Sequence, residues 1–431
     1  MTTSSSAVVP IMGQDEPPQR LRRLLYNQYF RQLPHWQRAG IVGGLVSLLL
    51  AMALLTMPPA KPSYNVAFIG NSMMYYNDFP RFMQTVSGND RMNQDCCLHG
   101  DAAFTTILNW GSGTYQIWHT GVARVKNDKG AILYDMGACT VEQLLFGYDE
   151  ALEYKVQNYE GGYNSYDDDA TNNDQFASYY DGKNPCLQNP SYYYYKQSLY
   201  ETNGDSPQWD FVVMNDRTRS PARSVSRNAS LQVLEDVYLP WFQETGATPV
   251  FLVTYGYDTP YRDMGGLDDV ATFTSLTYEG YKQYAALLQA NLPERQKPRL
   301  APVGLAFLMV YEENYGLWQK LFHIDRIHPS PHGTFLQGCV VHHTIYGKLP
   351  DKRIALVDNM SSLWNTARRM QPRKHRRMSM PTREEAEYLY HIAERITVRK
   401  QFPKTFIRYQ KGEASDYVPN DSIYADNDIY R

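Results

Sequence analysis

Five short apolar-rich segments, most of them followed by a stretch with helical periodicity, constrain the fold of this chain more than any other feature. The expected strands are residues 65–70, 94–99, 210–214, 249–255 and 300–305. The expected helices are residues 78–86, 115–125, 231–243, 272–292, 308–321 and 331–346. Strands that alternate with helices predict the α/β class, in which a parallel sheet is covered by helices on both faces.

The composition agrees with a folded domain that has a large core. Of the 431 residues, 43% are hydrophobic and 20% are charged, which excludes a disordered or collagen-like polymer. The formal net charge is only −3, so we expect no nucleic-acid partner. The length suggests one large domain or two smaller ones.

Residues 39–57 form a run of nineteen residues without a charge. As a helix this run would span roughly 28 Å of hydrocarbon, which predicts an N-terminal transmembrane helix. Residues 1–38 carry five Arg, whereas the other flank carries only Lys61 as far as residue 77, so the N-terminus is expected in the cytosol. An uncleaved signal anchor fits this pattern better than a cleaved signal peptide. A buried core helix of a soluble protein is the alternative.

This topology predicts a single-pass type II membrane protein, with the bulk of the chain in the lumen of the Golgi or ER, or outside the cell. Three triplets then become candidate N-glycosylation sites, at Asn228, Asn359 and Asn420. The expected organisation is a cytosolic tail (1–38), a signal anchor (39–57), a linker (58–64), a domain (65–400) and a polar C-terminal tail (401–431).

Residues 148–210 interrupt the α/β pattern with an acidic, Tyr-rich insertion of net charge −9. Exposed Tyr side chains can stack on sugar rings, so the insertion could recognise a glycan; alternatively, its Tyr residues simply pack on the domain. A basic run at 368–377 could pair with the insertion or with an anionic surface, or be a solvated linker. Thr382 and Glu385 have the spacing of a capping box and predict a last helix that ends near residue 396.

Polar residues with catalytic potential follow several of the expected strands. Gly70-Asn71-Ser72 ends the first strand, at the sheet edge where open α/β sheets bind ligands. Asp325 precedes His328 by three residues, so it can hold one ring nitrogen while the other takes a proton from Ser72. Asn215 follows another strand, and its amide could stabilise an oxyanion. Separately, these residues could be a helix cap, a structural hydrogen bond and a turn residue; together they predict nucleophilic catalysis by serine.

These motifs resemble the SGNH (GDSL-like) hydrolase superfamily, and most closely its uncharacterised members with a G-N-S first block. The matching blocks are Phe68-Ile69-Gly70-Asn71-Ser72, Leu98-His99-Gly100, Val213-Met214-Asn215-Asp216 and Asp325-Arg326-Ile327-His328. The resemblance implies a flavodoxin-like three-layer α/β/α sandwich with a central parallel sheet of about five strands.

The resemblance also implies a role for each matching residue. Ser72 would be the nucleophile, with Asp325 and His328 completing the triad. The backbone of Ser72, together with Gly100 and Asn215, would form the oxyanion hole. The third block departs from the family pattern, because Val213 stands where the family has Gly.

No metal ion or cofactor is expected. His323, Asp325, His328 and His332 are close in sequence, but they form no known zinc motif, and no dinucleotide or phosphate loop is present. In an oxidising lumen, one or two disulfide bridges could form among four cysteines, Cys96, Cys97, Cys139 and Cys186. Cys339 is expected to be a buried free thiol.

We therefore expect a membrane-anchored lumenal or extracellular serine esterase that removes acyl groups, chiefly acetyl, from a carbohydrate. The acyl chemistry follows from the triad, whereas the carbohydrate follows only from the resemblance and the Tyr-rich insertion. Two alternatives remain open: an O-acyltransferase that uses the same triad, and a catalytically silent glycan-binding protein.

Overall fold

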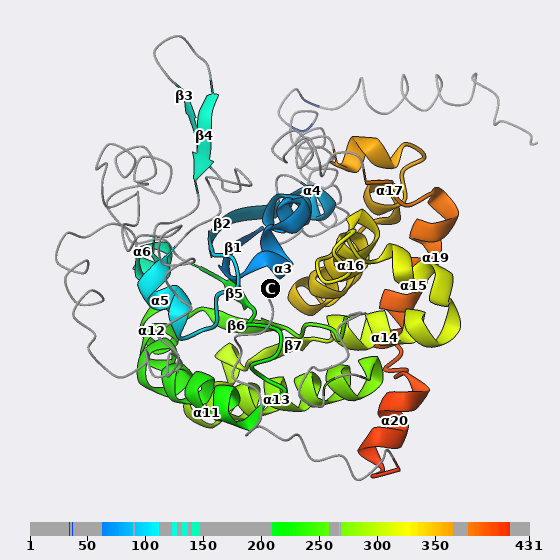
Figure 1. Cartoon of the computed structure of the whole chain (residues 1–431). Helices are drawn as coiled ribbons and strands as arrows, with labels where there is room; N and C mark the ends of the chain where they lie inside the picture. The colour runs from blue at the N-terminus through cyan, green and yellow to red at the C-terminus, as the bar shows by residue number, and fades with distance from the viewer. Residues whose placement is uncertain are drawn as a thin grey trace, which may run out of the picture. The chain divides into compact units, whose positions relative to one another are not determined.

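A five-stranded parallel sheet forms the centre of the computed structural model (Figure 1). Its strands lie in the order β2-β1-β5-β6-β7, and every neighbouring pair is parallel. The strands are β1 (Tyr64–Gly70), β2 (Met92–Leu98), β5 (Phe211–Met214), β6 (Thr248–Leu252) and β7 (Arg299–Ala301). Renumbered within the sheet, this is the 2-1-3-4-5 order of flavodoxin-like folds. The predicted α/β class and five-stranded parallel sheet are confirmed.

The chain divides into a unit of residues 1–61 and a unit of residues 62–431, and the sheet belongs to the second. The structure describes residues 34, 37, 63–88, 91–111, 123–126, 132–136, 140–146, 209–257, 267, 269–364 and 378–413. The predicted membrane helix 39–57 and most of the Tyr-rich insertion lie outside these residues. Within the described residues, no helix combines the length and apolar character that a membrane span needs.

Helices cover both faces of the sheet. Alternate residues of each strand point to opposite sides, and apolar side chains on both sides must be buried. Val66 and Phe68 of β1 belong to one hydrophobic core, and Ala67 and Ile69 to the other. The first core is covered by α4 (Phe79–Ser87), α14 (Val303–Glu313), α15 (Tyr315–Lys320), α16 (Pro331–Tyr346), α17 (Lys352–Ala355) and α19 (Arg383–Thr397). The second is covered by α5 (Thr106–Trp110), α6 (Val141–Phe146), α11 (Ser224–Val233), α12 (Leu239–Thr245) and most of α13 (Val270–Asn291).

The helix predicted over 231–243 is divided into two by a π-helical turn. α11 leads into this turn, η4 (Leu234–Tyr238), and α12 follows it. Pro240 near the start of α12 has no N–H to donate, and its ring clashes with a regular preceding turn. The chain widens there, so that the N–H of Leu239 bonds to the carbonyl of Leu234, five residues back.

Other predicted helices also differ from the structure. The end of the predicted helix 115–125 is wrong: β3 (Ala123–Lys126) pairs antiparallel with β4 (Ile132–Met136). The predicted helix 308–321 is two helices, α14 and α15, because Asn314 leaves helical geometry and caps α15 with its side chain.

The region predicted to be a polar tail begins with ordered structure. Helix α20 (Lys404–Gln410) follows α19, and its Phe406 is buried in the first core. The predicted capping box at Thr382 and Glu385 is present in both directions and starts α19.

Candidate active site

Ser72 is the first residue of helix α3 (Ser72–Tyr75), directly beyond the carboxyl end of β1. Asn71 is the N-cap, and its side-chain oxygen accepts a hydrogen bond from the Met73 N–H at 3.2 Å. Position 70 requires glycine, because a Cβ there would lie 2.0 Å from Asn215 Oδ1. Within the described part of the chain, neither the hydroxyl nor the backbone N–H of Ser72 has a hydrogen-bond partner.

Asn71 and Asn215 form a reciprocal pair that joins the ends of β1 and β5. The amide of Asn215 donates to Asn71 Oδ1 at 2.8 Å, and the backbone N–H of Asn71 donates to Asn215 Oδ1 at 3.3 Å. The other hydrogen of the Asn215 amide goes to the carbonyl of Asp216 at 3.0 Å. Asn215 is fully buried, and both of its amide hydrogens are occupied. Donation by Asn215 to an oxyanion would therefore require it to release one of these bonds.

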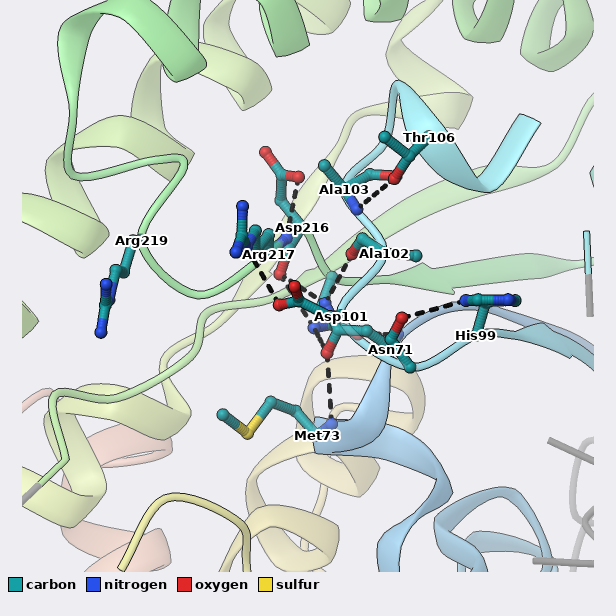
Figure 2. Close-up of polar contacts among 12 residues, drawn as sticks. Asn71, Met73, His99, Asp101, Ala102, Ala103, Thr106, Asp216, Arg217 and Arg219 are labelled. Carbon is teal, nitrogen blue, oxygen red and sulfur yellow. Dashed lines mark hydrogen bonds and ion pairs between the residues drawn. The ribbon is translucent and has the colours of Figure 1, made fainter. Parts of the chain in front are cut away.

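Gly100 follows β2 and stands between His99 and Asp101, two residues that Figure 2 shows close to Asn71. The Asn71 amide donates to the carbonyl of Ala102 at 2.9 Å, which joins the turn after β2 to the segment that carries Ser72. Beside it, a ring nitrogen of His99 lies 2.9 Å from the Gly100 carbonyl, and burial lowers the pKa of His99. Asp101, which has a left-handed φ of 56°, pairs with Arg217 Nε at 3.0 Å. The N–H of Gly100 has no partner among the described residues.

Asp216 connects the end of β5 to helices α11 and α13. Its carboxylate accepts hydrogen bonds from the N–H groups of Phe104 and Arg217 and from the hydroxyls of Ser230 and Tyr284, at 2.6–3.0 Å. Burial raises the pKa of Asp216, while these four donors act in the opposite direction. Asp216 is a framework residue that holds the site in place.

Asp325 and His328 lie in a tight loop between α15 and α16. Phe322 and Pro329 form a β-bridge that closes the loop. Oδ1 of Asp325 accepts from the N–H groups of Ile327 and His328, both at 2.9 Å, and its Oδ2 lies 2.9 Å from His328 Nδ1. This arrangement assigns the proton to Nδ1 and leaves Nε2 as the acceptor nitrogen. The predicted carboxylate–imidazole contact is present, and 18% of the His328 side chain is exposed.

The charge of Asp325 is strongly favoured. Burial would raise the pKa of Asp325, but contacts from His323 and His328 outweigh it and hold that pKa far below its usual range. His323 Nδ1 lies 3.3 Å from Oδ2. Asp325 is therefore a carboxylate at every physiological pH and can stabilise an imidazolium.

Three contacts fasten this loop and α16 to the segment that carries Ser72. The ring of Tyr76 lies on the imidazole of His328. The Asn77 amide donates to the carbonyl of Pro329 at 2.8 Å, and the Gln337 amide donates to the carbonyl of Met73 at 3.1 Å. Among the described residues no hydrogen bond joins Ser72 to His328. Such catalytic contacts are often long until substrate binds, so the Ser72–His328 proton transfer stays a prediction.

Sequence reasoning gave Tyr76 and Asn77 no role in this site, and it weighed His323 only as a metal ligand. Two of them lie just after the G-N-S block, and the third precedes Asp325 by two residues, so only proximity in sequence signalled them. His332, which was weighed with His323, Asp325 and His328 as a metal ligand, contacts Glu385 at 3.0 Å instead. In the described ranges, no group of three His, Cys, Asp or Glu residues is placed to hold a metal ion.

The other predicted residues are placed as follows. Asn228 is exposed on α11, but Ser230 of the same triplet is buried on Asp216; Asn359 is exposed, and Asn420 lies outside the described residues. Cys339 is a buried free thiol on α16, as predicted. Cys96 and Cys97 are buried in β2, whereas Cys139 and Cys186 lie outside the described residues, so the bridges stay a prediction.

Comparisons with known proteins give only distant similarities to solved structures. No family model matches the chain. No protein of curated function matches it either. Among solved structures, it is similar to a "putative SGNH hydrolase" from Slackia heliotrinireducens, with 16% identity and a TM-score of 0.35, over 66% of this chain and 99% of the other.

It is also similar to a DUF4886 family protein from Bacteroides uniformis, with 10% identity and a TM-score of 0.42, over 79% of this chain and 96% of the other. Both similarities are too distant to transfer the role of any residue. The strand order of this chain agrees with the flavodoxin-like fold predicted from the sequence.

Proposed function

We propose that this protein is an SGNH-type serine esterase that acts through an acyl-enzyme on Ser72. The observation that carries the proposal is the Asp325–His328 pair. Tyr76 and Asn77, which follow Ser72 closely in the chain, hold the loop of this pair against the Ser72 segment. A half-buried, stacked imidazole with a carboxylate on one nitrogen, and with no partner for the other among the described residues, is the arrangement of a general base. A purely structural Asp–His hydrogen bond would not need to pack on Tyr76, whose N–H donates to the carbonyl of Ser72.

In the proposed reaction, His328 Nε2 takes the proton of Ser72 Oγ as that oxygen attacks the ester carbonyl. Asp325 holds the ring by Nδ1 and stabilises the imidazolium, which then gives its proton to the leaving alcohol. Water repeats the sequence on the acyl-enzyme and restores Ser72.

Two backbone groups are available to stabilise the oxyanion. The N–H groups of Ser72 and Gly100 have no partner among the described residues, and both lie at the carboxyl edge of the sheet. Asn215 contributes either by releasing one amide hydrogen or by holding Asn71, and hence the nucleophile turn, in place.

The test is turnover of short-chain aryl esters, combined with covalent labelling by a fluorophosphonate. Ser72→Ala should lower kcat by several orders of magnitude and abolish labelling, which mass spectrometry should map to Ser72 in the native protein. His328→Ala should lose nearly as much, and Asp325→Asn less, because Asp325 only orients and stabilises the ring. Ser275→Ala is the matched control: Ser275 is a buried serine on α13 whose hydroxyl bonds only within its helix. Unchanged hydrolysis by folded Ser72→Ala would refute the assignment.

The proposed natural substrate is an acetylated or otherwise acylated carbohydrate, recognised in part by the Tyr-rich insertion. This part rests on the resemblance and on the insertion's composition. The purified domain should release the acyl group from an acetylated glycan even when excess unacetylated acceptor is present. Predominant appearance of the acetyl group on the acceptor would instead identify an O-acyltransferase. A variant without the insertion should keep turnover of the aryl ester and lose turnover of the glycan. This result would show that the insertion recognises the glycan.

The proposed location is the lumenal or extracellular side of a membrane, anchored by residues 39–57 with the N-terminus in the cytosol. The apolar run and the Arg-rich flank support this topology. Protease protection in microsomes tests it, because a type II protein should lose only its N-terminal tail to protease added from the cytosolic side. Digestion of the whole domain would exclude the topology.

A further inference from the structure

Tyr76 contacts both members of the Asp325–His328 pair from outside their loop. Its ring lies face to face with the imidazole of His328, with 3.9 Å between centroids and 6° between planes. Its hydroxyl donates to Asp325 Oδ2 at a long 3.4 Å. Tyr76 is 9% exposed, so water is largely excluded from the contact.

The chain segment around Tyr76 fixes this ring relative to Ser72. Tyr76 begins the short helical turn η2 (Tyr76–Asp78), and its N–H donates to the carbonyl of Ser72, one turn earlier. The next residue, Asn77, has a left-handed φ of 57° and anchors its amide on Pro329 and Thr334, both at 2.8 Å. The turn that presents the nucleophile therefore also presents the aromatic face on which the base lies.

We infer that Tyr76 is a positioning residue of the triad, which holds the His328 ring in its productive plane and stabilises the imidazolium formed during turnover. This inference rests on the esterase function proposed above. The proton that leaves Ser72 Oγ as the new C–O bond forms stays on His328 until the leaving oxygen takes it. During that interval the cation lies on the electron-rich face of the Tyr76 ring.

The charges around His328 favour this interpretation. Among the described residues, Asp325 contacts His328 on its own loop, His323 contacts the same carboxylate oxygen of Asp325, and Tyr76 approaches from η2. Tyr255, beyond β6, lies behind Asp325, and burial raises its pKa, so it stays neutral. Asp325 can hold the ring only along one edge, through Nδ1. Within the part of the chain that the structure describes, the ring of Tyr76 lies on one face of the imidazole, where it restricts tilting about that hydrogen bond and covers a face of the cation.

The experiment separates the ring of Tyr76 from its hydroxyl. Tyr76→Phe keeps the stacked ring, whereas Tyr76→Leu removes it. We expect Tyr76→Phe to keep kcat within about threefold, because the 3.4 Å hydroxyl bond is weak. Tyr76→Leu should lower kcat about tenfold with little change in KM, and should move the acid limb of the pH–rate profile to lower pH.

A second Tyr–His stack in the fold supplies the matched control. Tyr346 lies on His342 within α16, with 4.4 Å between centroids and 21° between planes. Tyr346→Leu should disturb packing in the same way as Tyr76→Leu and leave kcat within about twofold. If Tyr76→Leu does not fold, pentafluorophenylalanine at position 76 replaces it, because this ring keeps the shape and reverses the charge of the face. Its kcat should then fall well below that of Tyr76→Phe.

Wild-type kcat and an unchanged acid limb in folded Tyr76→Leu would overturn the inference, as would equal losses in the Phe and Leu variants. NMR of the His328 ring protons makes the result independent of turnover. In the native protein the ring current of Tyr76 should move these protons upfield, and their pH midpoint should fall in Tyr76→Leu. If the pH midpoint of the His328 ring protons falls in Tyr76→Leu but the native protein has no esterase activity, only the proposed function is refuted. If the native protein is active but Tyr76→Leu keeps normal activity and an unchanged midpoint, only the role of Tyr76 is refuted.

Discussion

Glu385 provides a quantitative test of how the C-terminal helix α19 supports the candidate site. Its carboxylate accepts hydrogen bonds from Lys320 Nζ at 2.7 Å and from the N–H of Thr382 at 2.9 Å, and it lies 3.0 Å from His332 Nε2. Lys320 and His332 lie on either side of the loop that carries Asp325 and His328, and Ser330 Oγ bonds to the carbonyl of Lys320. One side chain therefore holds both ends of the loop that carries Asp325 and His328 against α19.

The magnitude follows from these contacts. Loss of the capping interaction should cost about 1 kcal/mol. A buried His332 left without its partner should cost about 1–2 kcal/mol, and the exposed Lys320 pair at most about 0.5 kcal/mol. We therefore expect Glu385→Ala to lower the free energy of unfolding by about 2–4 kcal/mol. Glu385→Gln, which can still complete the capping box, should cost about half as much.

The pH dependence of this effect has a definite sign. Burial would raise the pKa of Glu385, but hydrogen bonds from Lys320, Thr382 and His332 outweigh it and lower the pKa from 4.5 to about 2. Because the folded-state pKa lies below the unfolded one, the carboxylate stabilises the fold above pH 4.5, and that stability is lost as the pH falls toward 2. At about 1.36 kcal/mol per pKa unit the upper bound is about 3.4 kcal/mol, which solvent screening reduces to about 1–2 kcal/mol.

Urea denaturation of the wild type, Glu385→Gln and Glu385→Ala at pH 7 and at the lowest pH that preserves the fold provides the measurement. The difference between wild type and Glu385→Gln should shrink as the pH approaches 2. Equal stability of all three proteins at pH 7 would refute the interpretation of Glu385 as a clamp. If the difference in unfolding free energy between wild type and Glu385→Gln stayed constant down to pH 2.5, the charge of Glu385 would play no part in it.

Three further outcomes are expected. Gly70→Ala should destabilise the protein by about 2–4 kcal/mol in urea titration, because its Cβ would meet Asn215 Oδ1 at 2.0 Å; an unfolding midpoint equal to wild type would contradict this. If Asn215 acts only by holding Asn71, Asn215→Ala and Asn71→Ala should lower kcat by similar factors, and the double variant by no more than either; additive losses in this cycle would instead indicate a direct oxyanion contact. Cys339 should resist a thiol reagent in the native state and react on unfolding, because it is fully buried and burial raises its pKa; rapid native labelling, mapped by mass spectrometry, would argue against this burial.

Local sequence patterns were sufficient for the sheet and for the polar residues at its carboxyl edge. The segment that ends in Gly70 is apolar on both faces, and such a strand is stable only between two helical layers. Because β1, β2 and β5 are parallel neighbours, their carboxyl ends must lie side by side, so Ser72, Gly100 and Asn215 could be assigned to one edge. Asp325 and His328 are three residues apart, and their hydrogen bond needs only a local turn.

Only the tertiary structure decided how these pieces are held together. Nothing in the sequence indicates that the Asn215 amide is used up by Asn71, or that Tyr76 covers His328, because those contacts join residues 144 and 252 positions apart. The π-helical turn before α12 depends on how Pro240 is accommodated against the core, and the end of the predicted helix 115–125 became a strand because a partner strand was available. Periodicity reports which face of a segment is apolar, whereas the orientation of a polar side chain depends on donors and acceptors that the fold brings from elsewhere.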